Sequence, residues 1–261
     1  MPTVQILGTG FATLVVNKES QESAMTLSAM SRNVVSLLLA AGLVAPAAAA
    51  LKPFQAEFDM YRDGKKLGVA VLTLKQTSGS QWQFDSVNEG TEGLAGMANV
   101  SIQESSQFVE SDSGLAAQHY RFNQSMLFKK KQRTVDVQGT RVHLDDGDKQ
   151  YDFDLPAGGV LDRNIIVLAL MQDVPTATGD RDYPVADKRE VGSQKYRFGA
   201  VESVETPAGK FDARRVDRIR EQPGRTTTTW FAESIGWMPV RILQVEPDGE
   251  NLELRLRKTG S

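Results

Sequence analysis

The 261-residue sequence predicts a mainly β protein of the α+β class, in which one long curved antiparallel sheet, or a partly closed barrel, wraps one buried helix. From Phe54 onward, apolar residues recur mostly at every second position, which is the period of a half-buried strand. Short segments rich in Gly, Asp and Ser separate these stretches, and one stretch, at about residues 162–171, has helical spacing instead. Because short connections between successive strands favour antiparallel neighbours, the strands should form a meander.

The segment before Phe54 has the three-part pattern of a secretory signal peptide. Arg32 precedes an apolar run over residues 34–44, which ends at Pro46 and a run of alanines. Ala48 and Ala50 supply the small-x-small pattern of a cleavage site. An uncleaved membrane anchor is the alternative, but the run falls short of the roughly 20 strongly apolar residues that span a bilayer. The sequence therefore predicts a periplasmic protein, cleaved near Ala50, without a transmembrane anchor in the mature chain.

The translation start is a separate question. A start at Met1 would place Glu19 and Glu22 where a short basic region is expected, whereas a start at Met25 or Met30 gives a leader of ordinary length. We therefore interpret residues 1–24 as an over-annotated upstream segment, 25–50 as the signal peptide and 51–261 as a single β-rich domain.

The first predicted strand places Phe54, Ala56 and Phe58 on one face, and the Arg-Asp-Gly-Lys turn at residues 62–65 returns the chain as a hairpin. Further strands are expected over residues 82–88, 100–110, 115–123, 131–137, 140–144 and 149–155. After the helix, strands are expected over residues 183–186, 195–206, 211–219, 226–232, 239–245 and 252–256. No long Pro/Gly/Ser-rich linker divides these stretches, which favours one domain.

The predicted helix interrupts the period of two. Leu161, Ile165 and Leu168 recur at helical spacing, and Asp162 can cap the N-terminus. The segment is apolar on most sides, so it should be largely buried against the sheet.

Composition excludes several kinds of chemistry. The chain has no cysteine, so disulfides, thiolate catalysis and Cys-ligated metals are excluded. Its net charge of −3 gives no general attraction for nucleic acid. His119 and His143 are isolated on predicted strands, and neither a nucleophile elbow nor a P-loop is present. We expect no cofactor, no metal and no enzymatic activity, with an enzyme of unrecognised type as the remaining alternative.

The C-terminal third resembles a known family. Thr-Pro-Ala-Gly-Lys-Phe-Asp-Ala at 206–213 is followed by Thr-Trp-Phe-Ala at 229–232 and Gly-Trp-Met-Pro-Val-Arg at 236–241. With Leu-Asp-Arg at 161–163, their order and spacing resemble the domain-of-unknown-function family 3108, over roughly residues 54–257. Members of that family look like exported proteins of Gram-negative bacteria, so the resemblance implies export but no catalytic motif. A looser likeness of layout is to the half-barrels of periplasmic lipoprotein carriers and the sigma-factor regulator RseB, and it concerns fold only.

Two sets of residues are candidates for a site. The sequence predicts an apolar lining made of Trp82, Phe84, Met97, Tyr120, Phe122 and Trp230. These are two aromatic pairs that each share a strand face, a methionine in a glycine-rich segment and a tryptophan in a β-branched run. A basic cluster predicts a contact patch for anionic lipid or an acidic partner, made of Lys129, Lys130, Lys131 and Arg133. A charged edge strand that prevents aggregation is the alternative role for that cluster.

These features favour a periplasmic, non-enzymatic binding or carrier protein for an apolar ligand, such as a lipid or an acyl chain, in the concavity of the sheet. The alternative function is an envelope protein that binds another protein through its basic strand or a sheet edge.

Overall fold

The computed structural model describes residues 51–93, 96, 100–127, 129–220 and 224–260. The expected upstream segment and signal peptide, the cleavage residues Ala48 and Ala50, and the candidate Met97 lie outside the described residues.

The first half of the described chain is a run of strands joined by hairpins. Its strands are β1 (Phe54–Arg62), β2 (Lys65–Ser78), β3 (Gln81–Gly90), β4 (Ser101–Ser111), β5 (Gly114–Met126), β6 (Lys129–Gln138), β7 (Arg141–Asp145) and β8 (Gln150–Asp154). The β1–β2 turn places Asp63 and Gly64 at φ values of 48° and 74°, which is the geometry of a hairpin turn that matches the twist of its strands. The predicted meander is therefore confirmed.

The second half of the described chain begins at the opposite edge of the sheet and ends at its centre. Its elements are β9 (Leu161–Asp162), α2 (Ile166–Asp173), β10 (Gly179–Asp187), β11 (Glu190–Thr206), β12 (Gly209–Ile219), β13 (Thr226–Ala232), the 3-10 turn η1 (Glu233–Ile235), β14 (Met238–Val245) and β15 (Asn251–Gly260). Within the described residues, one sheet of 15 strands runs in the order β8-β7-β6-β5-β4-β3-β2-β1-β15-β14-β13-β12-β11-β10-β9. The first and last strands of the described residues, β1 and β15, are therefore neighbours at the centre of the sheet.

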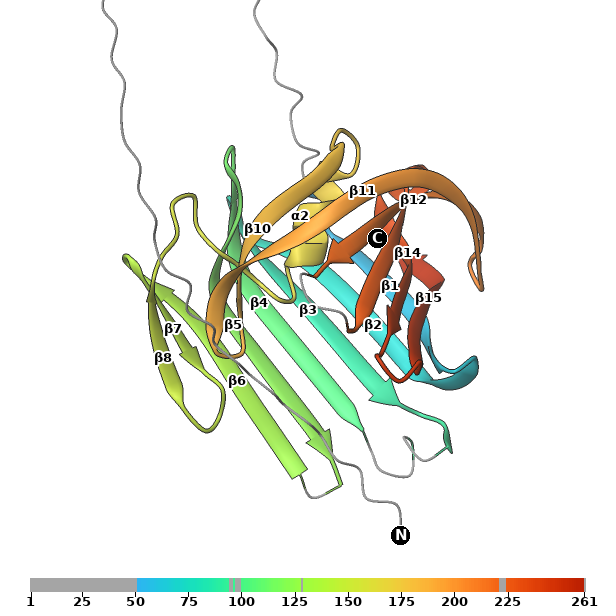
Figure 1. Ribbon diagram of the computed structural model, residues 1–261, viewed down its shortest axis with the longest axis horizontal. Helices are drawn as coiled ribbons and strands as arrows, with labels where there is room; N and C mark the ends of the chain where they lie inside the picture. The colour runs from blue at the N-terminus through green and yellow to red at the C-terminus, as the bar shows by residue number, and fades with distance from the viewer. Residues whose placement is uncertain (1–50, 94–95, 97–99, 128, 221–223, 261) are drawn as a thin grey trace, which may run out of the picture. The chain divides into compact units, whose positions relative to one another are not determined.

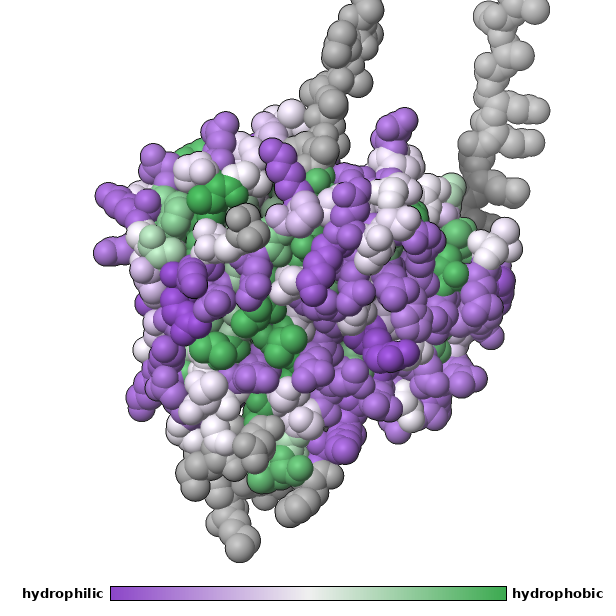
Figure 2. All heavy atoms as spheres, turned by 180° about the vertical axis from the view of Figure 1, so that it is seen from behind, coloured by the Kyte–Doolittle hydropathy of each residue, from purple (hydrophilic) through white to green (hydrophobic). Residues whose placement is uncertain are grey.

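The sheet curls around α2, which lies between the strands of the first half and β10–β12 (Figure 1). Alternation along the strands puts apolar side chains inside, and the outer surface is mostly hydrophilic (Figure 2). The main core combines the inner residues of both halves with the helix, including Phe58, Phe108, Leu168 and Phe231. The predicted curved sheet around one buried helix is confirmed.

The β9 end of the sheet approaches the strands of the first half without extending their ladder. The amide of Ala117 on β5 donates to the carbonyl of Val160 before β9 at 2.8 Å. A second apolar cluster packs Tyr120, Phe122 and Leu144 of the first half against Val160 and Ala186 of the second. An open sheet thus forms a partly closed barrel through side-chain packing.

The helix differs from the prediction at its start. Residues 161–162 form the short strand β9, in which Leu161 and Asp162 pair in parallel with Val185 and Ala186 of β10. The helix begins at Ile166, four residues later than predicted, because the Asp162 side chain bonds the backbone of the intervening turn instead of capping the helix. No helix among the described residues has the length and apolar character needed to cross a membrane.

Candidate functional site

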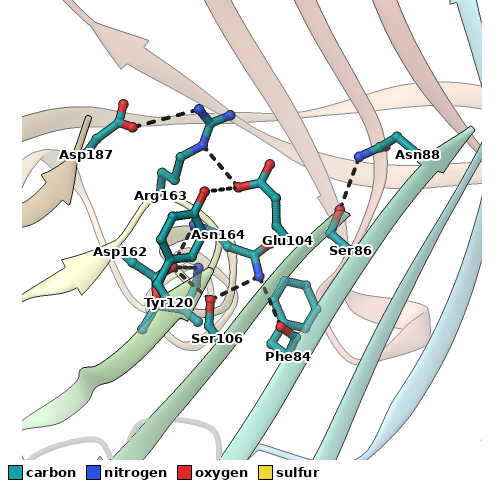
Figure 3. Close-up of polar contacts among 11 residues, drawn as sticks. Phe84, Ser86, Asn88, Glu104, Ser106, Tyr120, Asp162, Arg163, Asn164 and Asp187 are labelled. Atoms are coloured by element: carbon teal, nitrogen blue, oxygen red, sulfur yellow. Dashed lines mark hydrogen bonds and ion pairs between the residues drawn. The ribbon is translucent and has the colours of Figure 1, made fainter. Parts of the chain in front are cut away.

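The N-terminal end of α2 is held by a buried carboxylate. One oxygen of Asp162, Oδ1, accepts hydrogen bonds from the backbone amides of Asn164 (2.8 Å) and Ile165 (3.0 Å) and from the Ser106 hydroxyl (3.0 Å) (Figure 3). The side chain is fully buried, and Oδ2 has no hydrogen-bond partner among the described residues. Burial disfavours the charged form more than the donors favour it, and it raises the pKa of Asp162 to about 7.

Asn164 ties the same turn to two strands of the first half. Its Nδ2 donates to the carbonyl oxygen of Phe84 on β3 at 3.0 Å and to the hydroxyl of Ser106 on β4 at 3.1 Å. A turn of the second half is thereby hydrogen-bonded to the inner face of the first.

A charged cluster lies beside this turn. The Tyr120 hydroxyl donates to Glu104 Oε2 at 2.6 Å, and Arg163 Nε lies 3.1 Å from the same oxygen (Figure 3). Arg163 also reaches Asp187 at the end of β10, with its Nη1 3.8 Å from Oδ1. Burial raises the pKa of Tyr120, so its hydroxyl stays protonated and remains a donor. These side chains link β4 and β5 of the first half to the turn after β9 and to β10 of the second, which suits a structural role.

The C-terminal end of α2 is held by a single arginine on β12. Arg214 donates from Nη2 to the Ala177 carbonyl at 2.6 Å, from Nε to the Gly199 carbonyl at 3.1 Å, and from Nη1 to the Val174 carbonyl. Val174 is the C-cap of α2, so the cation beside its carbonyl also complements the helix dipole. The helix is therefore anchored at both ends.

An apolar cavity of about 620 Å³ opens beside the last turn of α2. The described residues that line it come from the start of β1, β2, the end of α2, the β13–β14 connection and the end of β15: Leu51, Lys52, Pro53, Phe54, Leu74, Met171, Gln172, Ile235, Gly236, Trp237, Met238, Thr259 and Gly260. Glu110 on β4 supports the rim, because its Oε1 accepts from the Gln172 amide at 2.8 Å and from the Leu51 backbone at 3.1 Å. The lining is mostly apolar, with polar groups confined to Lys52, Gln172 and Thr259.

Trp237 is held at the cavity in an unfavourable backbone conformation. Its φ of 59° follows the φ of 74° at Gly236, and a bulky residue seldom occupies this left-handed region. Two hydrogen bonds impose it: Trp237 N to Ala232 O at 2.8 Å, and Gly236 N to Glu233 O at 2.9 Å. Strain of this kind is concentrated at functional sites, and here it puts a half-buried tryptophan among the lining residues.

None of the predicted lining residues that the structure describes lies on the cavity wall. Trp82 and Phe84 are buried in the main core, and Phe84 stands behind the wall, with its ring centroid 6.2 Å from that of Phe54. Tyr120 and Phe122 belong to the second apolar cluster.

Trp230 has a different environment. Its Nε1 donates to Glu202 at 2.8 Å, and the guanidinium groups of Arg241 and Arg215 lie 4.8 Å and 6.0 Å from its ring. The ring is thus enclosed by cations and a carboxylate, as in a cation–π stack.

The structure divides the predicted basic patch. Lys129, Lys130 and Lys131 are exposed at the start of β6. Arg133 is half-buried, and its guanidinium lies 5.0 Å over the Phe122 ring. The three lysines therefore form a surface cluster to which Arg133 contributes little.

The two histidines pair with carboxylates on neighbouring strands, His119 with Asp136 and His143 with Asp152. Among the described residues, no group of three or more His, Cys, Asp or Glu side chains converges as a metal site.

Sequence reasoning missed the wall residues Met171, Gln172, Ile235 and Trp237. Two signals could have pointed to them: a polar glutamine at the end of an apolar helix, and a Gly-Trp pair after a turn. Neither signal shows that the two segments meet in space.

The comparisons with known proteins concern fold and family. The model of the family described as "Protein of unknown function (DUF3108)" matches residues 57–257, and no curated protein matches the chain. Among solved structures, a β-barrel-like protein of the domain of unknown function DUF1849 from Brucella abortus is similar with a TM-score of 0.51 and 11% identity, over 79% of this chain and 96% of that chain. This likeness extends to the fold alone.

Two further structures have lower TM-scores. A protein with a YmcC-like fold from Bacteroides fragilis has a TM-score of 0.29 and 13% identity, over 81% of this chain and 97% of that chain. A protein from Parabacteroides distasonis that carries the name lipoprotein has a TM-score of 0.30 and 12% identity, over 80% of this chain and 96% of that chain.

Proposed function

Since the chain belongs to the DUF3108 family, whose function is unknown, we propose from its own geometry that it is a non-enzymatic periplasmic binding or carrier protein. Its ligand is an apolar molecule, such as a lipid or an acyl chain, bound in the cavity beside the last turn of α2.

The cavity is the observation that carries this proposal. Its volume of about 620 Å³ lies within the range of roughly 300–1,000 Å³ found for small-molecule sites. Leu74, Met171 and Ile235 offer apolar surface from three different elements, while Lys52 and Gln172 are polar. This distribution suits an amphiphile whose apolar chain lies inside and whose polar end meets the polar groups of the lining.

The anchoring of α2 supports a preformed site. Asp162 and Arg214 fix the two ends of the helix, so the wall formed by Met171 and Gln172 keeps its position when the cavity is empty. A site that needs little ordering on binding retains more of its contact energy as affinity.

The polar lining supports binding without chemistry. The described polar side chains on the wall are Lys52, Gln172 and Thr259, which do not form a nucleophile with a neighbouring base. Glu104 and Arg163 of the charged cluster contact each other, and neither is among the residues that line the cavity.

Mass spectrometry and a fluorescent fatty acid test the binding function. Protein purified under native conditions should carry a lipid detectable by mass spectrometry, and the delipidated protein should bind a fluorescent fatty acid saturably. Trp237→Gly should weaken that binding about tenfold, which corresponds to losing about 1.4 kcal/mol of contact energy. Glycine accepts the left-handed conformation at position 237, so the fold should survive the change.

Trp230→Phe is the matched control, because this tryptophan lies off the cavity wall and its loss should leave the affinity unchanged. If the wild-type protein carries no lipid and binds no fatty acid, the proposed function is wrong.

The periplasmic location rests on the leader pattern ahead of Ala50 and has a separate test. The mass of the protein released from the periplasm should correspond to a chain that begins at Leu51. A product that keeps residues 34–44 would contradict export with cleavage.

A further inference from the structure

The tip of the β5–β6 hairpin exposes apolar residues. We define the β5–β6 tip as Met126, Leu127, Lys129, Lys130 and Lys131. Leu127 is 66% exposed and Met126 is 37% exposed, and among the described residues the remaining large exposed hydrophobic is Val201, on another strand. Two adjacent exposed apolar side chains at a hairpin tip mark this place as a possible contact surface.

The backbone conformation of Leu127 is unfavourable for a leucine, which makes its exposure more informative. Its φ is 53°, in the left-handed region where glycine or asparagine would fit at lower cost. A leucine that is both strained and exposed gains nothing for the folded monomer. The side chain is therefore available for a contact outside the monomer.

The charge around the tip is one-sided. Residues 113–135 contain Arg121, Arg133 and the three lysines of the tip but no Asp or Glu, although the whole chain has a net charge of −3. The three lysines are exposed, and none makes an ion pair with the described part of the chain. Unpaired lysines beside apolar side chains are complementary to an anionic surface with an apolar interior.

The tip also extends past the neighbouring strand β7. β7 pairs with β6 only from Thr134 onward, so Lys129, Lys130 and Lys131 extend beyond the edge that β7 covers. The tip lies at the lower end of the view in Figure 1, and apolar residues are exposed at the lower end of Figure 2 as well.

This end is opposite the cavity. Successive strands of the meander alternate in direction, so β5 ends where β1 ends, whereas the cavity is lined by Phe54 at the start of β1.

We propose that the β5–β6 tip binds bilayers that contain anionic phospholipids. Leu127 and Met126 enter the interfacial region, and the three lysines contact lipid phosphates. Protection of a sheet edge would account for the lysines but not for the exposed leucine, which favours association. A protein bound in this way holds the opening of the cavity away from the membrane surface that it contacts.

Vesicle flotation tests this surface. The wild-type protein should bind phosphatidylcholine vesicles that contain phosphatidylglycerol and should not bind vesicles of phosphatidylcholine alone. It should be released by 1 M salt, because the Debye length is then about 3 Å and most of the surface attraction is screened. Each lysine near an anionic surface contributes about a fivefold change in partitioning. The triple variant Lys129→Gln, Lys130→Gln, Lys131→Gln should therefore bind about 100-fold more weakly.

A second variant isolates the apolar part of the contact. Leu127→Gly removes the exposed side chain and relieves the backbone strain, so it should bind several-fold more weakly while its thermal unfolding is unchanged or occurs at a higher temperature.

The matched control removes the same charge elsewhere. The triple variant Lys75→Gln, Lys195→Gln, Lys210→Gln changes three exposed lysines on other strands and should bind as the wild-type protein does. The proposal is overturned if the wild-type protein does not distinguish the two vesicles, if the two triple variants weaken binding equally, or if the tip instead crosslinks an acidic protein and ignores vesicles.

Discussion

The two ends of α2 differ in how the surrounding sheet meets them. At the N-terminal end, Asp162, Asn164 and Ser106 fill the space between the halves of the sheet with buried hydrogen bonds. At the C-terminal end, Arg214 bonds the C-cap carbonyl of Val174 on one side, and Met171 and Gln172 border an open cavity on the other. An eight-residue helix is too short to be stable alone, so its position depends on these contacts.

The two ends of α2 therefore have different roles, with the N-terminal end fixing the position of the helix and the C-terminal end forming the cavity wall. A buried polar network is a costly way to gain stability, but it admits few alternative arrangements and so specifies position. The C-terminal end of α2 needs a fixed position, because a shift of the helix would close the cavity that this end borders. Variants at each end test whether the two ends contribute differently to the free energy of unfolding.

The largest effect is expected at Asp162. Asp162→Ala leaves three donors without their acceptor, in Ser106, Asn164 and Ile165. Since each unsatisfied buried donor costs roughly 1–3 kcal/mol, the free energy of unfolding should fall by about 4 kcal/mol. Urea denaturation measures it, and a loss below about 1 kcal/mol would show that the network does not hold the helix.

The pH dependence should be the next largest effect. The pKa of Asp162 is raised to about 7 by burial, so between pH about 4 and 7 the folded chain keeps a proton that the unfolded chain has released. The free energy of unfolding should therefore fall as pH rises through this window, by about 3 kcal/mol from this group.

Asp162→Asn isolates that contribution, because its amide oxygen can still accept the three hydrogen bonds while the group no longer titrates. The wild-type protein should lose stability relative to this variant as pH rises from 4 to 7. Parallel stability curves would mean that the carboxyl is not buried as described.

A smaller effect is expected at the other end of the helix. Arg214→Ala leaves the carbonyls of Val174 and Ala177 without their donor and should cost about 2 kcal/mol. Arg181→Ala, which breaks a partly exposed pair with Asp173, should cost less than about 1 kcal/mol. Equal losses in thermal denaturation would remove the distinction between an anchor and a surface pair.

The smallest effect is expected on the cavity wall. Met171→Ala enlarges a space that already exists and should cost about 1 kcal/mol, whereas Leu168→Ala, inside the packed core of the same helix, should cost about 3 kcal/mol. Urea denaturation of the two variants compares them directly. A Met171→Ala loss as large as that of Leu168→Ala would indicate that this end of the helix is packed and not open.

The sequence predicts the fold well because strand patterning is local. The alternation of Phe54, Ala56 and Phe58 marks the core face of β1, and the Asp-Gly turn at 63–64 marks its end. Strand ends are less accurate: β10 begins at Gly179 instead of Tyr183, because its first residues are polar yet pair with β11.

The start of the helix shows where local patterning fails. Asp162 has the features of a helix cap, but Ser106 and Ala186, remote in sequence, place it in a strand. The cavity could not be predicted for the same reason, because its wall combines both ends of the described chain with α2 and the β13–β14 connection. Trp230 shows the opposite failure, since an aromatic that the sequence pattern assigned to a ligand site is covered by two arginines.

The pairing of β1 with β15 at the centre of the sheet bears on the order of folding. A chain that emerges from a ribosome or a translocon presents β1 long before β15, so strands β1–β8 can form their hairpins while one edge of β1 is still bare. That edge stays available to other nascent chains until residues 251–260 arrive, and such distant contacts make folding slow. Loss of residues 251–260 should therefore leave a nearly complete sheet split along its middle and prone to aggregate.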